Sequence, residues 1–323
     1  MKNSKRAFVL TEVALGIMVV IMTFIMIQGR NAKDTDKVSV IIPNSDDNEW
    51  SAFRYGLRMA AQDQNIEIIV AGTGELGIEE EEETIEREID NGARAVIVQP
   101  SSGKGTEKML KQIEKKIPVM LVGEKETEDG TALEIPFTEP DNYGIGEALA
   151  QELLKDYNGK IKGKKIGIVS ETGDFGTAAD RRAGLENALA GMGTEILWSV
   201  SDLHGKEKGE ILKSQLAADI IIAFDDSSLI LAGECAQAND LHGALVYGIG
   251  NSTEAAYYLD VGAVQCLAVP DEFSVGYQSL TQIAKKLRQR AYELESQKVP
   301  YKVIRREALF SEENQKILFT MSQ

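Results

Sequence analysis

Short apolar segments alternate with amphipathic segments along most of the chain after residue 37. The first apolar segment, Val38–Ile42, is rich in valine and isoleucine, which is typical of a strand buried on both faces of a sheet. After a polar loop, Pro43–Glu49, apolar residues recur at helical spacing from Trp50 to Ala61. This strand–loop–helix unit predicts a parallel sheet covered by helices, because parallel strands are joined by crossover connections.

The same unit then repeats in two successive series. The first series predicts strands at Val38–Ile42, Glu67–Ala71, Ala95–Gln99 and Val119–Val122, with a shorter apolar segment at Leu133–Phe137. After Pro140, the second series predicts strands at Ile166–Val169, Glu195–Val200, Ile220–Phe224, Leu245–Ile249 and Val264–Val269. A long helix, Ser274–Glu295, and a weak strand, Val303–Ala308, complete the pattern. We therefore expect an α/β protein with two similar lobes, each a parallel sheet flanked by helices.

The break at Pro140 and the segments after the second series set the expected boundaries. We expect residues 37–138 with 271–300 to form the first lobe, and residues 139–270 with 301–323 to form the second. Because the last helix and the tail follow the second series, more than one stretch of chain is expected to join the lobes. Asp141 and Asn142 are expected to cap a helix and to lie at this hinge.

The N-terminal residues 1–36 differ from the rest and are expected to form a signal anchor and a linker. Phe8–Gln28 is nearly continuously apolar and long enough to span a bilayer as a helix. Lys2, Lys5 and Arg6 precede it, which predicts a cytoplasmic N-terminus and an extracytoplasmic remainder. The segment lacks the short apolar core and A-x-A site of a cleaved signal peptide. We expect one transmembrane helix that anchors the protein in the cell membrane by a single pass.

Composition narrows the possible partners and cofactors. The 323 residues carry a formal net charge of −16, which argues against nucleic acid as a partner because nucleic-acid binding needs basic surface. The two histidines, His204 and His242, stand in no metal-binding motif, and the two cysteines, Cys235 and Cys266, are expected to be buried thiols, with a disulfide left open. We therefore expect neither a metal nor another cofactor.

Five stretches of the chain stand in an order that points to one family. They are VSVIIPNSDDNEWSAFRYGLRMAA (38–61), NGARAVIVQPSS (91–102), TGDFGTAADRRAGLENAL (172–189), IIIAFDDSSLILAG (220–233) and PDEFSVGYQSL (270–280). Together they resemble the ribose-type, or type I, periplasmic binding proteins, whose fold also forms the effector-binding core of LacI-type repressors. A membrane segment stands where a repressor has its DNA-binding headpiece, so the resemblance favours a binding protein.

The resemblance implies a ligand site between the lobes. In sugar-binding members the first loop supplies an asparagine and aromatic residues, and this region holds Asp47, Asn48, Glu49 and Trp50. The Trp50 ring could stack on a sugar face, since it combines an apolar ring with a polar edge. It could equally be the first core residue of the following helix.

Several residues depart from the pattern of the family's sugar binders. Gly123-Glu124 stands where those proteins carry an Asp-Arg pair, and their clamping arginine aligns with Ala179, two residues before Arg181. Gly250 and Pro270 replace a further aspartate and a glutamine. The remaining candidates for ligand contacts are Glu124, Arg181, Asp225, Asp226, Asn251 and Asp271. The alternative role for each acidic residue is a helix cap or a solvated loop position, and Asp226 is expected to cap the helix that follows it.

These features predict an extracytoplasmic solute-binding protein rather than an enzyme. The resemblance implies that a small polar ligand, such as a sugar or polyol, is captured between hinged lobes and presented to an ABC permease or to a histidine kinase ectodomain. The lost sugar contacts leave open a sensor or assembly protein with a degenerate cleft. A hydrolase that uses the cleft carboxylates is a further alternative.

Overall fold

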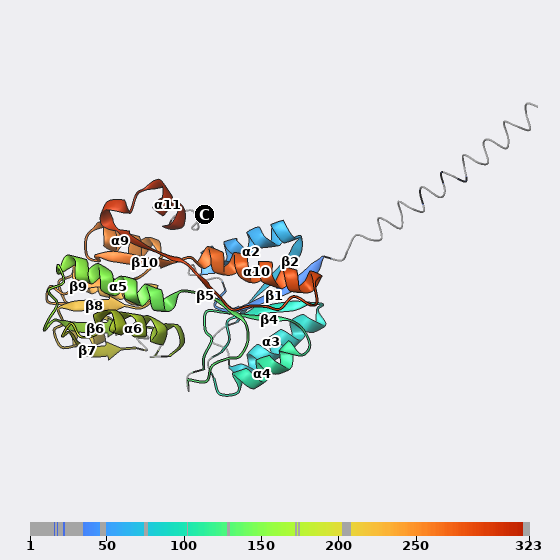
Figure 1. The fold of residues 1–323 in the computed structure, drawn as a ribbon, viewed down its shortest axis with the longest axis horizontal. Helices are drawn as coiled ribbons and strands as arrows, with labels where there is room; N and C mark the ends of the chain where they lie inside the picture. The colour runs from blue at the N-terminus through green and yellow to red at the C-terminus, as the bar shows by residue number, and fades with distance from the viewer. Residues whose placement is uncertain are drawn as a thin grey trace, which may run out of the picture.

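The computed structural model describes residues 16, 18, 22, 35–45, 50–73, 77–101, 103–127, 130–171, 173, 175–201 and 208–318, and it contains two α/β lobes (Figure 1). The first lobe contains β1 (Asp36–Pro43), α2 (Ser51–Gln64), β2 (Ile66–Thr73), α3 (Ile78–Asp90), β3 (Ala95–Val98), α4 (Thr106–Glu114), β4 (Val119–Val122), β5 (Phe137–Pro140), α10 (Glu272–Arg288) and β11 (Gln297–Val299). The second contains α5 (Asn142–Asp156), β6 (Lys165–Val169), α6 (Gly176–Leu189), β7 (Glu195–Val200), α7 (Lys208–Lys213), β8 (Ile220–Ala223), α8 (Asp226–Gln237), β9 (Leu245–Ile249), α9 (Thr253–Asp260), β10 (Cys266–Pro270), β12 (Tyr301–Arg305), the 3-10 helix η2 (Arg306–Ala308) and α11 (Glu312–Leu318).

Each lobe is built on a six-stranded sheet. The first sheet has the strand order β11-β5-β4-β3-β1-β2, and all its neighbouring strands are parallel. The second has the order β12-β10-β9-β8-β6-β7, in which only β12 runs antiparallel to its neighbour. The central strands β3, β4 and β8 are buried at every position, as expected when helices cover both faces. The prediction of two lobes with helix-covered parallel sheets is confirmed.

The chain passes between the lobes at three places: from β5 to α5, from β10 to α10, and from β11 to β12 (Figure 1). At the first crossing the Asp141 side chain accepts a hydrogen bond from the N–H of Gly144, so its predicted role as a helix cap is confirmed. At the third crossing only Pro300 separates two strands that belong to different sheets. Three short connections of this kind allow the lobes to move against each other as a hinge.

One helix pair packs tightly in each lobe. In the first lobe, α2 and α10 lie side by side (Figure 1), and a Cβ added at Gly276 would lie 2.2 Å from the carbonyl oxygen of Phe53. In the second lobe, α5 and α6 approach equally closely, and a Cβ at Gly184 would lie 2.0 Å from the carbonyl oxygen of Tyr143. Glycine at these positions lets two helix backbones come into direct contact.

Two predictions for the C-terminal region are wrong in detail. The long helix was expected to reach Glu295, but α10 ends at Arg288. After that residue, side chains of α10 form hydrogen bonds with the backbone N–H and carbonyl groups of the chain, in place of helical hydrogen bonds. Gln282 holds the N–H and carbonyl of Glu295, and the Lys286 ammonium bonds the carbonyl oxygens of Arg290 and Tyr292. The weak strand is shifted to Tyr301–Arg305, and the three-residue strand β11 before it was not predicted.

The predicted membrane segment Phe8–Gln28 lies outside the described residues, apart from three isolated positions. Within the part of the chain that the structure describes, no helix combines the length and apolar character that crossing a membrane requires.

Candidate functional site

The loops at the carboxyl ends of the strands carry most of the predicted site residues. In open α/β sheets, ligands bind at this edge. Asp47, Asn48 and Glu49, in the loop after β1, lie outside the described residues. The structure therefore leaves their predicted role untested.

Trp50 follows directly and precedes α2. Its ring packs edge-on against Phe53, with 5.4 Å between the ring centroids, and it borders the core of the first lobe. Its indole Nε1 is buried and has no hydrogen-bond partner among the described residues. A buried N–H group without a partner is costly, so a polar group that reached it would gain a hydrogen bond. Both predicted roles of Trp50, core residue and ligand contact, stay open.

Glu124, at the end of β4, contacts the second lobe. Its carboxylate accepts hydrogen bonds from the backbone N–H and the hydroxyl of Thr177, at 3.2 and 2.9 Å. Burial raises the pKa of Glu124, while the hydrogen bonds from Thr177 and the charges of Arg181 and Lys125 act in the opposite direction.

Arg181, on α6, is held by groups of the protein itself. Its Nε donates a 2.9 Å hydrogen bond to Oδ1 of Asn142, and its Nη1 donates to the carbonyl oxygen of Phe224. Burial lowers its pKa, and the negative charges of Asp225 and Glu124 oppose this. Among the described residues, no hydrogen bond donated by Nη2 is found, and the predicted contact of Arg181 with a ligand stays a prediction.

The adjacent acids Asp225 and Asp226 fasten loops of the second lobe together. Asp225 caps α8 through the N–H of Ser228 at 2.7 Å, and its second oxygen accepts from the N–H of Glu171 at 2.6 Å. Asp226 accepts from the backbone N–H groups of Asn251 and Ser252 at 2.8 and 3.0 Å. The prediction that Asp226 caps the following helix is therefore wrong. The helix begins at Asp226 itself, which leaves Asp225 in the capping position.

Asp271 and Asn251 are also fixed by local contacts. Asp271 caps α10, since its two carboxylate oxygens accept from the N–H and hydroxyl of Ser274 at 2.9 and 2.6 Å. Asn251 is positioned through its backbone by Asp226. Asp225, Asp226 and Asp271 therefore accept hydrogen bonds from N–H groups of their own lobe, which favours positioning roles over acid–base chemistry for these three acids.

Two residues near these loops, Lys125 and Gln99, were not predicted. Lys125 bonds the Glu139 carboxylate at 2.7 Å and Asp180 at 2.5 Å, so it contacts both β5 and α6. Gln99 follows β3 beside Gly123, and its buried Oε1 has no hydrogen-bond partner within the described part of the chain. The strand-end rule would have found Gln99, because it immediately follows a buried strand. Lys125 gave no such signal, since its partners lie 14 and 55 residues away.

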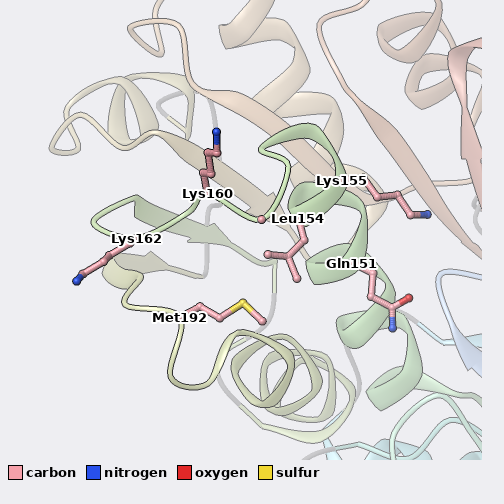
Figure 2. Close-up of a pocket in the computed structure, with 7 residues that line it drawn as sticks. Gln151, Leu154, Lys155, Lys160, Lys162 and Met192 are labelled. Atoms are coloured by element: carbon pink, nitrogen blue, oxygen red, sulfur yellow. The ribbon is translucent and has the colours of Figure 1, made fainter.

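The cavities of the second lobe differ in position. One of about 640 Å³ lies at the end of α5 that is remote from the hinge (Figure 2). Its labelled lining residues are Gln151, Leu154, Lys155, Lys160, Lys162 and Met192. Leu154 and Met192 point into it and none of the predicted site residues lines it. A much smaller one, of about 40 Å³, lies at the carboxyl ends of β6 and β8 beside Ser170 and Phe224. Among the described residues, no group of three or more His, Cys, Asp or Glu is arranged to hold a metal ion.

Two α/β lobes joined by three hinge segments, with polar side chains at the facing strand ends, are the architecture of bilobed binding proteins. The sequence matches the family described as periplasmic binding protein domain over residues 38–291, and the chain belongs to this family. No curated protein sequence matches the chain.

Solved structures with the same fold cover most of the chain at low sequence identity. A carbohydrate transporter solute-binding protein from Agrobacterium radiobacter, in complex with D-arabinose, has a TM-score of 0.75 and 17% identity, covering 89% of this chain and 100% of its own. GanP, a glucose-galactose binding protein from Geobacillus stearothermophilus, has a TM-score of 0.73 and 18% identity, covering 86% and 100%. The XylFII–LytSN complex contains a chain with a TM-score of 0.69 and 14% identity, covering 84% and 98%. At this level of identity the likeness shows the fold.

Proposed function

We propose that the protein is an extracytoplasmic solute-binding protein that captures a small polar ligand, a sugar, polyol or related molecule, between its lobes. The observation that carries the proposal is the family match across both lobes, on a fold whose lobes are joined by three crossings. Ligand binding would shift an equilibrium between open and closed arrangements of the lobes, and a partner would recognise the closed form. The sugar ligands of the neighbouring structures support this class of ligand.

The proposed lobes are residues 37–138 with 271–300 and residues 139–270 with 301–323. The strand pairing supports this division, because β11 joins the first sheet and β12 the second. The proposed ligand contacts are those predicted from the sequence, together with Gln99. Trp50 Nε1 and Gln99 Oε1 support a polar ligand, since one is a buried donor and the other a buried acceptor that the described residues leave unpaired.

The proposed partner is an ABC permease or a membrane sensor such as a histidine kinase ectodomain. A membrane anchor at Phe8–Gln28 is part of the proposal and is supported by the composition of that segment. An anchored protein delivers ligand only over short distances, which favours sensing or delivery to a neighbouring permease. The solved complex of XylFII with LytSN supports the view that this fold can present itself to a second protein.

The two tryptophans allow a direct test with a matched control. Trp50 lies at the proposed site, whereas Trp198 lies on β7, where its Nε1 bonds the carbonyl of Leu216. We expect a sugar or polyol that binds to change the fluorescence of the Trp198→Phe variant, in which only Trp50 emits. The Trp50→Phe variant, in which only Trp198 emits, should report little change. A panel that leaves the emission of both variants and the melting temperature of the wild-type protein unchanged would contradict the proposed function.

A further inference from the structure

The loop that follows β4 reaches the second lobe through two consecutive residues. The Glu124 carboxylate accepts hydrogen bonds from the N–H and the hydroxyl of Thr177, at 3.2 and 2.9 Å. The Lys125 ammonium pairs with Asp180 at 2.5 Å, three residues further along α6. Because Thr177 and Asp180 belong to the second lobe, side chains of the protein itself join the two lobes.

The N-terminus of α6 can bind a carboxylate, and no side chain of the described residues before the helix caps it. The N-cap residue, Phe175, makes no side-chain hydrogen bond to the helix. The first N–H groups of a helix have no partners within it, and they attract negative charge. Gly176 leaves the necessary space, since its φ is +54° and a Cβ there would lie 1.8 Å from Oε2 of Glu124. The cap of α6 is therefore supplied by the other lobe.

Two cations reduce the cost of burying this carboxylate. Arg181 lies one turn after Thr177 on α6, and Lys125 is the neighbour of Glu124 in sequence. Both charges favour the ionised form of Glu124 and so oppose the effect of burial on its pKa. Arg181 is itself fixed by Asn142, so its position does not depend on a ligand.

We propose that Glu124 is a latch that holds the lobes closed when no ligand is present. The carboxylate forms the hydrogen bonds across the lobes that would otherwise come from a ligand's polar groups. Each interlobe hydrogen bond stabilises the closed state and not the open state. Loss of the latch therefore raises the population of the open state. The latch concerns the empty protein, so its test is separate from that of ligand binding.

The distance between the lobes can be measured by double electron–electron resonance on the full-length chain in detergent, with no sugar added. Spin labels at Gln112→Cys on α4 and Ala183→Cys on α6 report on opposite lobes, and both positions are exposed. The native Cys235 and Cys266 are 2% and 0% exposed, so they are shielded from labelling. When no other residue is changed, we expect one dominant short distance between the two spin labels.

The Glu124→Ala variant should show a longer and broader distance distribution. Two hydrogen bonds to a carboxylate are lost, so we expect the closed-to-open ratio to fall at least about tenfold. Thr177→Val, which removes the hydroxyl donor alone, should shift the distribution less in the same direction. It also keeps the test valid if Glu124→Ala fails to fold. Glu134→Gln, which removes a carboxylate that pairs with Lys111 inside the first lobe, is the control and should leave the distances unchanged. Unchanged distances in both Glu124→Ala and Thr177→Val, or in whichever of them folds, would overturn the latch.

Discussion

Lys125 is the residue whose removal most directly tests the electrostatics of the interlobe region. Its side chain is 16% exposed and bonds Glu139, which is 1% exposed, and Asp180, which is 31% exposed. In Lys125→Met the Glu139 carboxylate would keep, among the described residues, one hydrogen bond, from the Asn142 amide at 3.4 Å. Removing one partner of a buried ion pair costs about 3–5 kcal/mol, whereas the more exposed pair with Asp180 contributes at most about 1 kcal/mol. We expect the free energy of unfolding at pH 7 to fall by about 3 kcal/mol.

The pH dependence of this loss has a definite sign. Burial raises the pKa of Glu139 above its usual value, and the Lys125 charge partly opposes this. A raised pKa in the folded state means that stability is lost as pH rises from the unfolded value through the folded one. Without Lys125 the pKa of Glu139 rises further, so this loss grows and extends to higher pH. The deficit of the variant should therefore be largest near neutral pH and should shrink as the pH falls toward 4.5, the usual pKa of a glutamate.

Urea unfolding of the full-length protein in mild detergent, followed by tryptophan fluorescence, measures the effect. The matched control is the double variant Lys125→Met/Glu139→Gln, which removes both charges of the buried pair and should lose about half as much stability as Lys125→Met or less. The reasoning is refuted if Lys125→Met costs less than about 1 kcal/mol at pH 7. It is also refuted if the double variant is as unstable as the single variant at every pH.

Three other changes test separate parts of the structure. Glu81 is fully buried, one of its carboxylate oxygens is unpaired within the described residues, and burial raises its pKa. Glu81→Gln should therefore raise the free energy of unfolding at pH 7 by up to about 1 kcal/mol. Thermal melts from pH 5 to 8 should also show that the variant loses less stability than the wild-type protein as the pH rises. Gly276→Ala would push a methyl group against the carbonyl of Phe53 and should cost about 1–3 kcal/mol in urea unfolding, by separating α2 from α10. Arg305 donates a hydrogen bond to the Glu152 carboxylate. Burial alone would raise the pKa of Glu152, but the hydrogen bonds from Lys155 and Arg305 hold it below its usual value. Arg305→Met should therefore cost about 2–3 kcal/mol at pH 7 and less at acidic pH, where Glu152 becomes protonated, as acid titration of stability can show.

Local patterns were enough to predict the architecture. Each central strand is a short apolar run in which valine, isoleucine and leucine predominate, and such runs need helices on both faces. The Asp141 cap was equally local, because the capping atom and the N–H of Gly144 are three residues apart. β11 could not be predicted, because only three residues form it and its pairing with β5 depends on the folded first lobe.

The contacts of the site were less predictable, because they join distant parts of the sequence. Glu124 and Thr177 are 53 residues apart, and nothing near Glu124 indicates that it caps a helix of the other lobe. Asp225 and Asp226 are adjacent and chemically identical, so their separate roles depend on the residue at which α8 begins. Both acids nonetheless lie at a strand end, as the sequence indicated.

Native mass spectrometry of the full-length protein, released from detergent after saturation with a panel of sugars and polyols, tests the central claim most directly. We expect one added small polar molecule per chain, which is lost when the protein is unfolded. At a hundredfold excess over its dissociation constant, such a ligand would also stabilise the fold by about 2.7 kcal/mol. The mass of the bare chain under every condition would contradict the claim that the lobes form a site for a small polar solute.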